Sequence, residues 1–231
     1  MKKVRFWILS FTWGLPMTLI GCIVFLVLMV FGFKPKKFGY TYYINIGKHW
    51  GGVELGAFFL TDSSDHYGIK CHEHGHCLQN LWVGPFFPFL VAIPSALRYW
   101  LFEIKTEKGK ALYSLLVMTI LLLITGALVI LGRVFEITWL LIVGIVLFSY
   151  MALVGFWLIG RELPKFQDST KPEPDYDEFW PEGNATRRGT ELIRELEARR
   201  NEIQIHELTQ KIKEDLKESK GQNDKNKPIS F

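Results

Sequence analysis

The chain has 231 residues and a formal net charge of +4, and 49% of its residues are hydrophobic. The positive charges lie beside apolar blocks and in a mixed-charge tail, which favours a lipid bilayer as partner and argues against nucleic acid. Only three cysteines are present, and Cys22 lies inside an apolar block, so a disulfide framework is not expected. Cys71 and Cys77, six positions apart on an expected helix, are too far apart to bond, and we expect them to pack.

Long apolar blocks predict a mostly α-helical integral membrane protein. Residues 1–33 hold the first block, which we interpret as a retained N-terminal transmembrane anchor because it is too long for a signal peptide and lacks a cleavage site. Residues 105–165 hold two more, at 111–132 and 137–160, which predict a transmembrane helical hairpin. Each block reaches the roughly 20 residues that a helix needs to cross a bilayer.

Residues 34–104, between the anchor and the hairpin, predict a small unit at the membrane surface. Runs rich in aromatic and β-branched residues, 38–46 and 51–62, favour the two strands of a small β-hairpin. The polar side chains of residues 63–65 favour a helix start. Residues 84–102 are apolar but contain three prolines, so this segment is a kinked span, a re-entrant piece or an interfacial helix.

Beyond the hairpin the composition changes to proline and charged residues. Residues 166–218 combine a carboxylate segment with a long polar helix, in which apolar residues keep helical spacing from about 185 to 216. Residues 219–231 are expected to form a disordered tail.

The stretch KCHEHGHCLQN (residues 70–80) places His72, Glu73 and His76 in an H-E-x-x-H pattern. On a helix, residues four apart share a face, so both imidazoles can reach one metal ion. Zn²⁺ is the ion expected for this pattern. Glu73 lies about 100° further around the helix, where it would act as the general base for a zinc-bound water. A histidine-rich loop or interface helix is the alternative. We expect no ligand role for the remaining histidines, which are His49, His66, His74 and His206.

A catalytic zinc site usually has a third protein ligand. Glu182 is the favoured candidate, because Phe179, Trp180 and Pro181 form an apolar start to a helix in an otherwise polar region. The other downstream carboxylates lie next to apolar blocks and are most simply interpreted as solvated charges at helix ends. They are Glu103, Glu107, Glu136 and Glu162.

Together these motifs resemble those of the gluzincin membrane metallopeptidases, in which H-E-x-x-H is followed far downstream by E-x-x-A-D. Glu182 and Ala185 match the second motif, whereas Thr186 stands where those families carry an Asp that hydrogen-bonds a ligand imidazole. The chain also resembles a group of small, uncharacterised bacterial membrane proteins, which implies the bacterial inner membrane. Site-2 intramembrane proteases share H-E-x-G-H, but they place an Asp-Gly motif in a later membrane helix, and the apolar blocks here contain no Asp.

The resemblance implies a membrane-bound zinc-dependent metallopeptidase, a hydrolase with a peptide or protein substrate. We expect an extended peptide to pair with the predicted strand that contains Gly51, Gly52, Val53, Glu54 and Leu55. Tyr67 and His74 are weak candidates for stabilising the oxyanion.

Two alternatives to an enzyme stay open. A non-catalytic protein would bind zinc in a closed site with four protein ligands, using Cys71 or Cys77 as the fourth. A partner-binding membrane protein would instead use the polar helix at 185–216 to dock another helix.

The distribution of lysines conflicts with a shared metal site. A simple four-span topology would place His72 and Glu182 on opposite sides of the membrane. Shared ligation therefore predicts that residues 84–102 do not fully cross, or that the site lies within the membrane depth between bent helices. In the first case, the lysines at 34–37 and the basic tail place the site on the cytoplasmic side, although the basic N-terminus would then begin outside.

Overall fold

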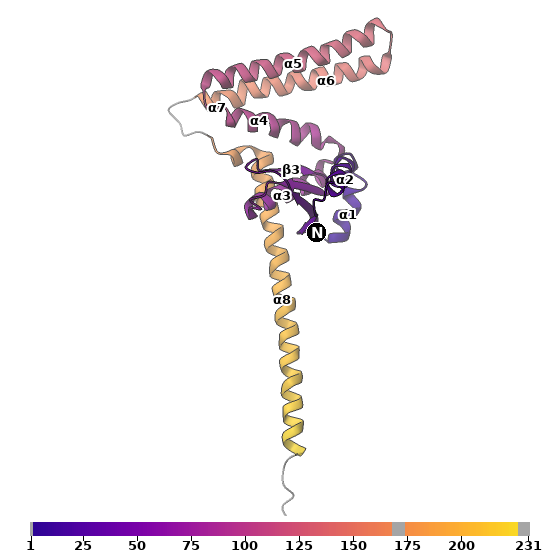
Figure 1. Cartoon of the computed structure of the whole chain (residues 1–231). Coiled ribbons are helices and arrows are strands. Elements are labelled where there is room, and N and C mark those ends of the chain that lie inside the picture. Colours follow the sequence, from indigo (N-terminus) through magenta and orange to yellow (C-terminus); the bar gives the residue numbers. More distant parts are fainter. Residues whose placement is uncertain (1, 168–173, 226–231) are drawn as a thin grey trace, which may run out of the picture.

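The computed structural model describes residues 2–167 and 174–225, with side chains described over 2–166 and 174–212. Most of the described chain is helical, and one small sheet lies near its centre (Figure 1). Helix α4 lies between a long helical hairpin on one side and the layer formed by the sheet and α3 on the other (Figure 1).

The long hairpin consists of two helices that are long and apolar enough to cross a membrane. Helix α5 runs over Glu107–Val134. Helix α6, Thr138–Trp157, continues through the π-helical turn η3, Leu158–Glu162, into the short helix α7, Leu163–Gln167. Most of their apolar side chains are exposed, as expected for helices that face lipid. The predicted hairpin is therefore present, with a hydropathy that suits a bilayer.

The N-terminal block, which was predicted to be a transmembrane anchor, consists of two helices that meet at a bend. Helix α1, Lys3–Ser10, and helix α2, Leu15–Val30, meet at an angle of 93°. The break has a local cause, because Pro16 occupies the first turn of α2, where proline is favoured and cannot extend the preceding helix. Asn80 fixes the bend by donating a hydrogen bond to the Gly14 carbonyl (3.3 Å).

The sheet has four strands where the sequence predicted a two-stranded hairpin. Strands β1 (Lys36–Phe38), β2 (Thr41–Asn45), β3 (Gly52–Leu55) and β4 (Phe58–Thr61) lie in the order β1-β2-β4-β3. Each predicted strand is divided by a turn at a glycine with positive φ: Gly39 (56°) and Gly56 (76°). Strands β2 and β4 pair in parallel, and β3 forms an edge.

The metal-motif helix is followed by a sharp break. Helix α3 runs over Tyr67–Val83 and begins two residues after the predicted polar start, without a side-chain cap. A 3₁₀ turn, η1 (Gly84–Phe86), a π-helical turn, η2 (Pro88–Ala92), and helix α4 (Ile93–Glu103) follow, and the two halves of this helical pair are bent by 117°. The sharp bend falls at the start of the predicted proline-broken segment, and by length and composition the pair could form one broken span or a re-entrant loop.

The C-terminal part returns the chain to α3. A 3₁₀ turn, η4 (Tyr176–Glu178), leads into the 46-residue helix α8 (Trp180–Lys225). The helix continues beyond residue 219, where a disordered tail was expected, because its Glu, Lys and Gln residues have high helix propensity. Residues 226–231 lie outside the described part.

Helices α3 and α8 cross at small residues. A Cβ atom at Gly75 would lie 1.9 Å from the Ala185 carbonyl oxygen, and one at Gly189 would lie 1.8 Å from the Cys71 carbonyl oxygen. Larger residues would push the two helices apart. Beside the crossing, a cluster of buried side chains from α1, the sheet, α3 and α8 forms the main core; it includes Phe6, Tyr40, Phe59, Cys77, Leu81 and Leu192. All three cysteines are free, and Cys71 and Cys77 are buried, as predicted.

Candidate metal centre

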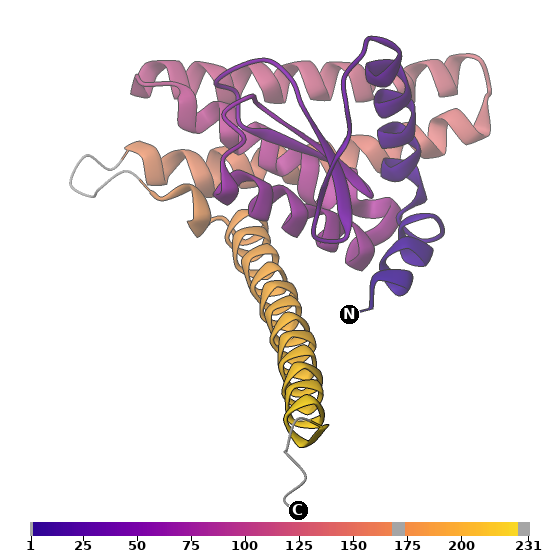
Figure 2. The ribbon, with the colours of Figure 1, turned by 60° about the horizontal axis from the view of Figure 1, so that its bottom comes forward.

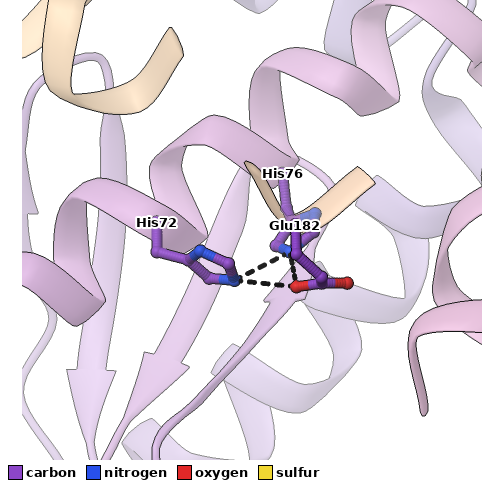
Figure 3. A group of neighbouring side chains, drawn as sticks. All are labelled: His72, His76 and Glu182. Atoms are coloured by element: carbon purple, nitrogen blue, oxygen red, sulfur yellow. Dashed lines mark hydrogen bonds and ion pairs between the residues drawn. The ribbon is translucent and has the colours of Figure 1, made fainter. Parts of the chain in front are cut away.

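The structure brings His72, His76 and Glu182 together, as the sequence predicted. Their ligand atoms all lie within 4.8 Å of one another, so the group could hold a metal ion. His72 and His76 lie one turn apart on α3, with their Nε2 atoms separated by 3.1 Å. Glu182 enters from the first turn of α8, and its Oε2 lies 3.1 Å from His72 Nε2 and 3.4 Å from His76 Nε2 (Figure 3).

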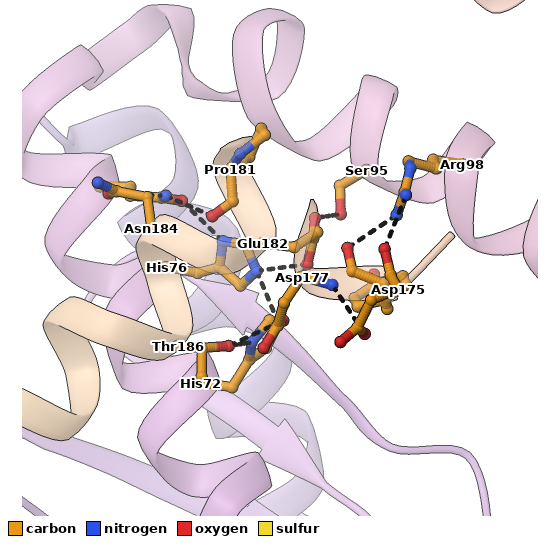
Figure 4. A network of polar contacts seen from close by, with 12 residues as sticks. His72, His76, Ser95, Arg98, Asp175, Asp177, Pro181, Glu182, Asn184 and Thr186 are labelled. Atoms are coloured by element: carbon orange, nitrogen blue, oxygen red, sulfur yellow. Dashed lines mark hydrogen bonds and ion pairs between the residues drawn. The ribbon is translucent and has the colours of Figure 1, made fainter. Parts of the chain in front are cut away.

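The hydrogen bonds behind the imidazoles define the tautomer of each neutral ring. Gln79 donates from Nε2 to the Pro181 carbonyl (2.7 Å), so its Oε1 faces His76 Nδ1 at 2.8 Å and can only accept. His72 Nδ1 lies 2.8 Å from Thr186 Oγ1, which donates to Asp177 Oδ1 (3.1 Å) and therefore accepts from the imidazole (Figure 4). With Nδ1 protonated, each imidazole presents a lone pair at Nε2.

The three converging atoms fit a cation. Glu182 is fully buried, and within the described residues its Oε2 has no hydrogen-bond partner. Its other oxygen accepts a hydrogen bond from the Ser95 hydroxyl. Three acceptor atoms that face one point repel one another unless a positive ion lies between them. The donor set of two imidazoles and a carboxylate suits a transition metal.

Thr186 occupies the position expected of it, but the negative charge comes from a residue that the sequence did not reveal. Asp177, in η4, accepts from Thr186 and so extends the chain of hydrogen bonds that begins at His72. Such partners orient a ligand imidazole and increase its basicity. Asp177 lies upstream of the E-x-x-A motif, in the turn η4. The sequence did not reveal its role because the position of this turn relative to α3 depends on the fold.

Glu73 lies beside the metal group and is not one of its three members. The residue is 5% exposed and lines the same cavity as the ligands. Burial raises the pKa of Glu73 to about 7, with His72 lowering it and Glu182 raising it. Strand β3 packs directly against this side chain, since a Cβ atom at Gly52 would lie 2.6 Å from Glu73 Cγ. Its role as the general base remains a prediction.

A cavity of about 400 Å³ opens in front of the metal group. One wall is apolar and comes from the bent α3–α4 pair; it includes Phe87, Val91 and Trp100. The other wall is the edge strand β3, with Gly52, Val53 and Glu54.

The predicted substrate strand is only partly available. Gly51 and Leu55 do not line the cavity, and the Leu55 carbonyl packs against α2 at Gly21. Glu54 points inward, is 5% exposed and accepts a hydrogen bond from the Gly56 amide. The accessible backbone edge therefore centres on Gly52 and Val53.

Neither weak candidate for the oxyanion lies at the cavity. The Tyr67 hydroxyl donates to Glu197 (3.1 Å), and His74 is fully buried, where its Nε2 accepts from the Tyr40 amide (3.3 Å). Burial lowers the pKa of His74 to about 4. Tyr176, which the sequence analysis did not single out, lines the cavity instead, with its ring centroid 6.3 Å from that of His72.

Arg98 connects the metal centre with the long hairpin. It is fully buried and donates to Glu162 Oε2 (3.1 Å). It also donates to the Tyr176 carbonyl (2.8 Å) and to the Asp175 carbonyl (3.0 Å) (Figure 4). Glu162, the last residue of η3, is 1% exposed and also pairs with Lys165 (2.7 Å). The interpretation of Glu162 as a solvated helix-end charge is therefore wrong, since the residue is buried and paired. The sequence did not reveal this pairing because Arg98 lies 64 positions earlier.

Comparisons of the chain with protein-family models, with curated proteins and with solved structures found no match.

Proposed function

We propose that the protein is a membrane-bound zinc-dependent metallopeptidase. The observation that carries the proposal is the convergence of two imidazoles and one carboxylate on a single point, next to a buried carboxylate that is not a ligand. Zinc is the favoured ion because two His and one Glu form a common catalytic zinc set with an open fourth position.

The proposed reaction is hydrolysis of a peptide bond. A zinc ion held by His72, His76 and Glu182 would lower the pKa of a water molecule and polarise the substrate carbonyl. Glu73 takes the proton from the attacking water and passes it to the leaving amine. The wall formed by Phe87 and Val91 limits the access of bulk water.

The substrate is proposed to bind as an extended segment along β3. A free strand edge offers backbone donors and acceptors that recognise a peptide largely without regard to its sequence. The edge available here is short, at Gly52 and Val53, and it ends where α2 covers Leu55. This favours an extended or loosely folded substrate over a compact domain. Tyr176 is proposed to donate to the developing oxyanion, since its ring borders the cavity near His72.

We further propose the bacterial inner membrane as its location, with the metal centre on the cytoplasmic side. The break between α3 and α4 supports this arrangement, because a re-entrant pair returns the chain to the face that it left. Helices α5 and α6 would then cross and return, leaving His72 and Glu182 on the same face.

A non-catalytic zinc protein is the second candidate. It requires a closed site with a fourth protein ligand. Within the described residues the metal group has three members, and neither Cys71 nor Cys77 is among them. Partner binding is favoured by a separate observation, the exposed apolar residues of the projecting part of α8, which are Ile203, Ile205, Leu208 and Ile212. Partner binding is compatible with catalysis at the metal centre.

Elemental analysis and a peptidase assay test the proposal together. Wild-type protein in detergent should hold about one zinc per chain, Glu182→Ala should lose it, and Glu73→Gln should keep the metal but lose cleavage of an unstructured fluorogenic peptide. The exposed neighbour Glu178 provides a matched control, Glu178→Gln, which should retain both properties. Zinc binding without cleavage of any unstructured substrate would favour the non-catalytic candidate, and absence of bound zinc after gentle purification would refute the metal centre.

A further inference from the structure

A second cavity, of about 580 Å³, lies between α1, α3 and α8 and is lined by none of the residues of the metal centre. Three arginines line it: Arg5 from α1, and Arg187 and Arg188 from α8. One side is apolar and includes Leu9, Leu81 and Trp82. The cavity therefore combines guanidinium groups with a hydrophobic wall. We refer to it as the arginine groove.

The arginine groove has an excess of positive charge. Within the part of the chain that the structure describes, none of the three guanidinium groups forms a hydrogen bond or an ion pair with a protein group. Two carboxylates also line the groove, but Glu195 is already paired with Arg199 on the outer surface of α8. Three cations against one remaining carboxylate, Glu191, leave two positive charges without a partner, which favours an anionic ligand.

Arg188 is oriented for binding an anion. Its guanidinium lies 3.9 Å from the centre of the Trp82 ring, in a stacking contact. Stacking uses the face of the guanidinium and leaves the N–H groups at its edge free to bind oxygen atoms. The planar set of N–H donors matches the geometry of a phosphate group.

The surroundings of the arginine groove indicate that the phosphate belongs to a lipid. Trp82 is 69% exposed, and the neighbouring Trp13, which donates to the Trp82 carbonyl (3.4 Å), is 46% exposed. On α1, Val4 and Ile8 are also exposed. Tryptophans are enriched at the level of lipid headgroups, and exposed aliphatic residues beside them suit acyl chains. A site for a free phosphate ion would not need this apolar border.

We propose that the arginine groove binds the phosphate group of an anionic phospholipid. Arg5, Arg187 and Arg188 contact the phosphate, and the acyl chain lies along Trp82 and Leu9. Figure 2 shows α1 and α8 both leaving the same side of the molecule, so a bound lipid would fix the position of α1 relative to the helix that carries Glu182. The proposal does not depend on catalysis or on the identity of the metal.

Native mass spectrometry of the full chain in a nonionic detergent tests the proposal. Phosphatidylglycerol and phosphatidylcholine with identical acyl chains are titrated separately, and bound lipids are counted. The wild type should retain one phosphatidylglycerol, and the triple variant Arg5→Gln, Arg187→Gln, Arg188→Gln should bind it roughly a hundredfold more weakly. The control variant Lys3→Gln, Arg194→Gln, Arg200→Gln removes the same charge from the same two helices and should bind like the wild type.

Three results would overturn the proposal. They are equal retention of the two lipids, equal losses in the groove and control variants, and full displacement of phosphatidylglycerol by millimolar inorganic phosphate, which would assign the groove to free phosphate. The single variant Arg187→Gln, at an exposed position, guards against misfolding of the triple variant. It should weaken phosphatidylglycerol binding by several fold, and unchanged binding would refute a contact with the phosphate.

Discussion

Replacing Arg98 with Met should weaken metal binding without touching a ligand. The side chain donates three hydrogen bonds: a buried one to Glu162 and two part-buried ones to the carbonyls of Asp175 and Tyr176, which precede Glu182 on the chain. Removing one partner of a buried ion pair costs about 3–5 kcal/mol of the free energy of unfolding. Lys165 remains paired with Glu162, so we expect a value near the lower end, about 3 kcal/mol.

Part of that loss should appear in the metal centre. If about 2 kcal/mol of the lost free energy had stabilised the segment that positions Glu182, the affinity for zinc should fall about 30-fold. Competition with a chromophoric chelator measures the affinity, and thermal unfolding of the metal-free protein in detergent measures the stability. Arg133→Met, at the exposed turn of the hairpin, provides the control for loss of a surface arginine.

The double variant Arg98→Met, Glu162→Gln separates positioning from general stability. It removes both buried charges, so stability should recover in part, yet the two carbonyls still lack a donor and zinc affinity should stay low. Zinc affinity within about threefold of the wild type in Arg98→Met, together with reduced stability, would refute the reasoning.

The remaining predictions concern the immediate surroundings of the metal centre. Gly52→Ala should reduce peptidase turnover while zinc content stays unchanged, because the added methyl group would lie 2.6 Å from Glu73 Cγ and displace it; normal turnover would show that Glu73 has room to move. Thr186→Val should weaken zinc binding about 10- to 100-fold by removing the acceptor for His72 Nδ1, which chelator competition measures. His74 is buried with its pKa lowered to about 4, so the unfolded chain binds its proton first as pH falls. The contribution of His74 to the stability of the metal-free protein should therefore fall by about 3 kcal/mol from pH 6.5 to pH 4. Because the raised pKa of Glu73 acts in the opposite sense over this range, the contribution is measured as the difference between thermal melts of the wild type and of His74→Leu at each pH.

The two candidate histidine ligands and the apolar helical hairpin could be predicted from the sequence because each depends on a local pattern. A spacing of four residues on α3 places His72 and His76 on one face whatever the rest of the chain does. Uninterrupted apolar runs likewise predict α5 and α6 from length alone. Glu182 was singled out by the apolar helix start at Phe179–Pro181 and then by the likeness of its motif to known metallopeptidases, whereas spacing along the chain would not have identified it.

The features that the sequence did not reveal are pairings over long distances. The parallel pairing of β2 with β4 required recognition that Gly39 and Gly56 each end a strand, which period-two alternation does not show. Arg98 and Glu162 each resembled a charge at the end of an apolar segment, although neither is exposed. The predicted anchor took no account of Pro16, where the second helix begins, or of the hydrogen bond from Asn80 of α3 to the Gly14 carbonyl at the bend.

The five residues from His72 to His76 are all constrained, although the proposed metal chemistry would require only three of them. His74 faces the core beneath Tyr40, and Gly75 is the point where α8 crosses α3. The same one and a half turns of helix therefore carry both the candidate metal ligands and the packing contacts of the core. The carbonyl of Ala185, for example, lies against Gly75 within the motif. A saturation library over these five residues, sorted separately for expression and for zinc retention, should yield two distinct classes of variant. Changes at His74 and Gly75 would reduce the amount of folded protein, and changes at His72 and His76 would reduce the metal content of protein that still folds.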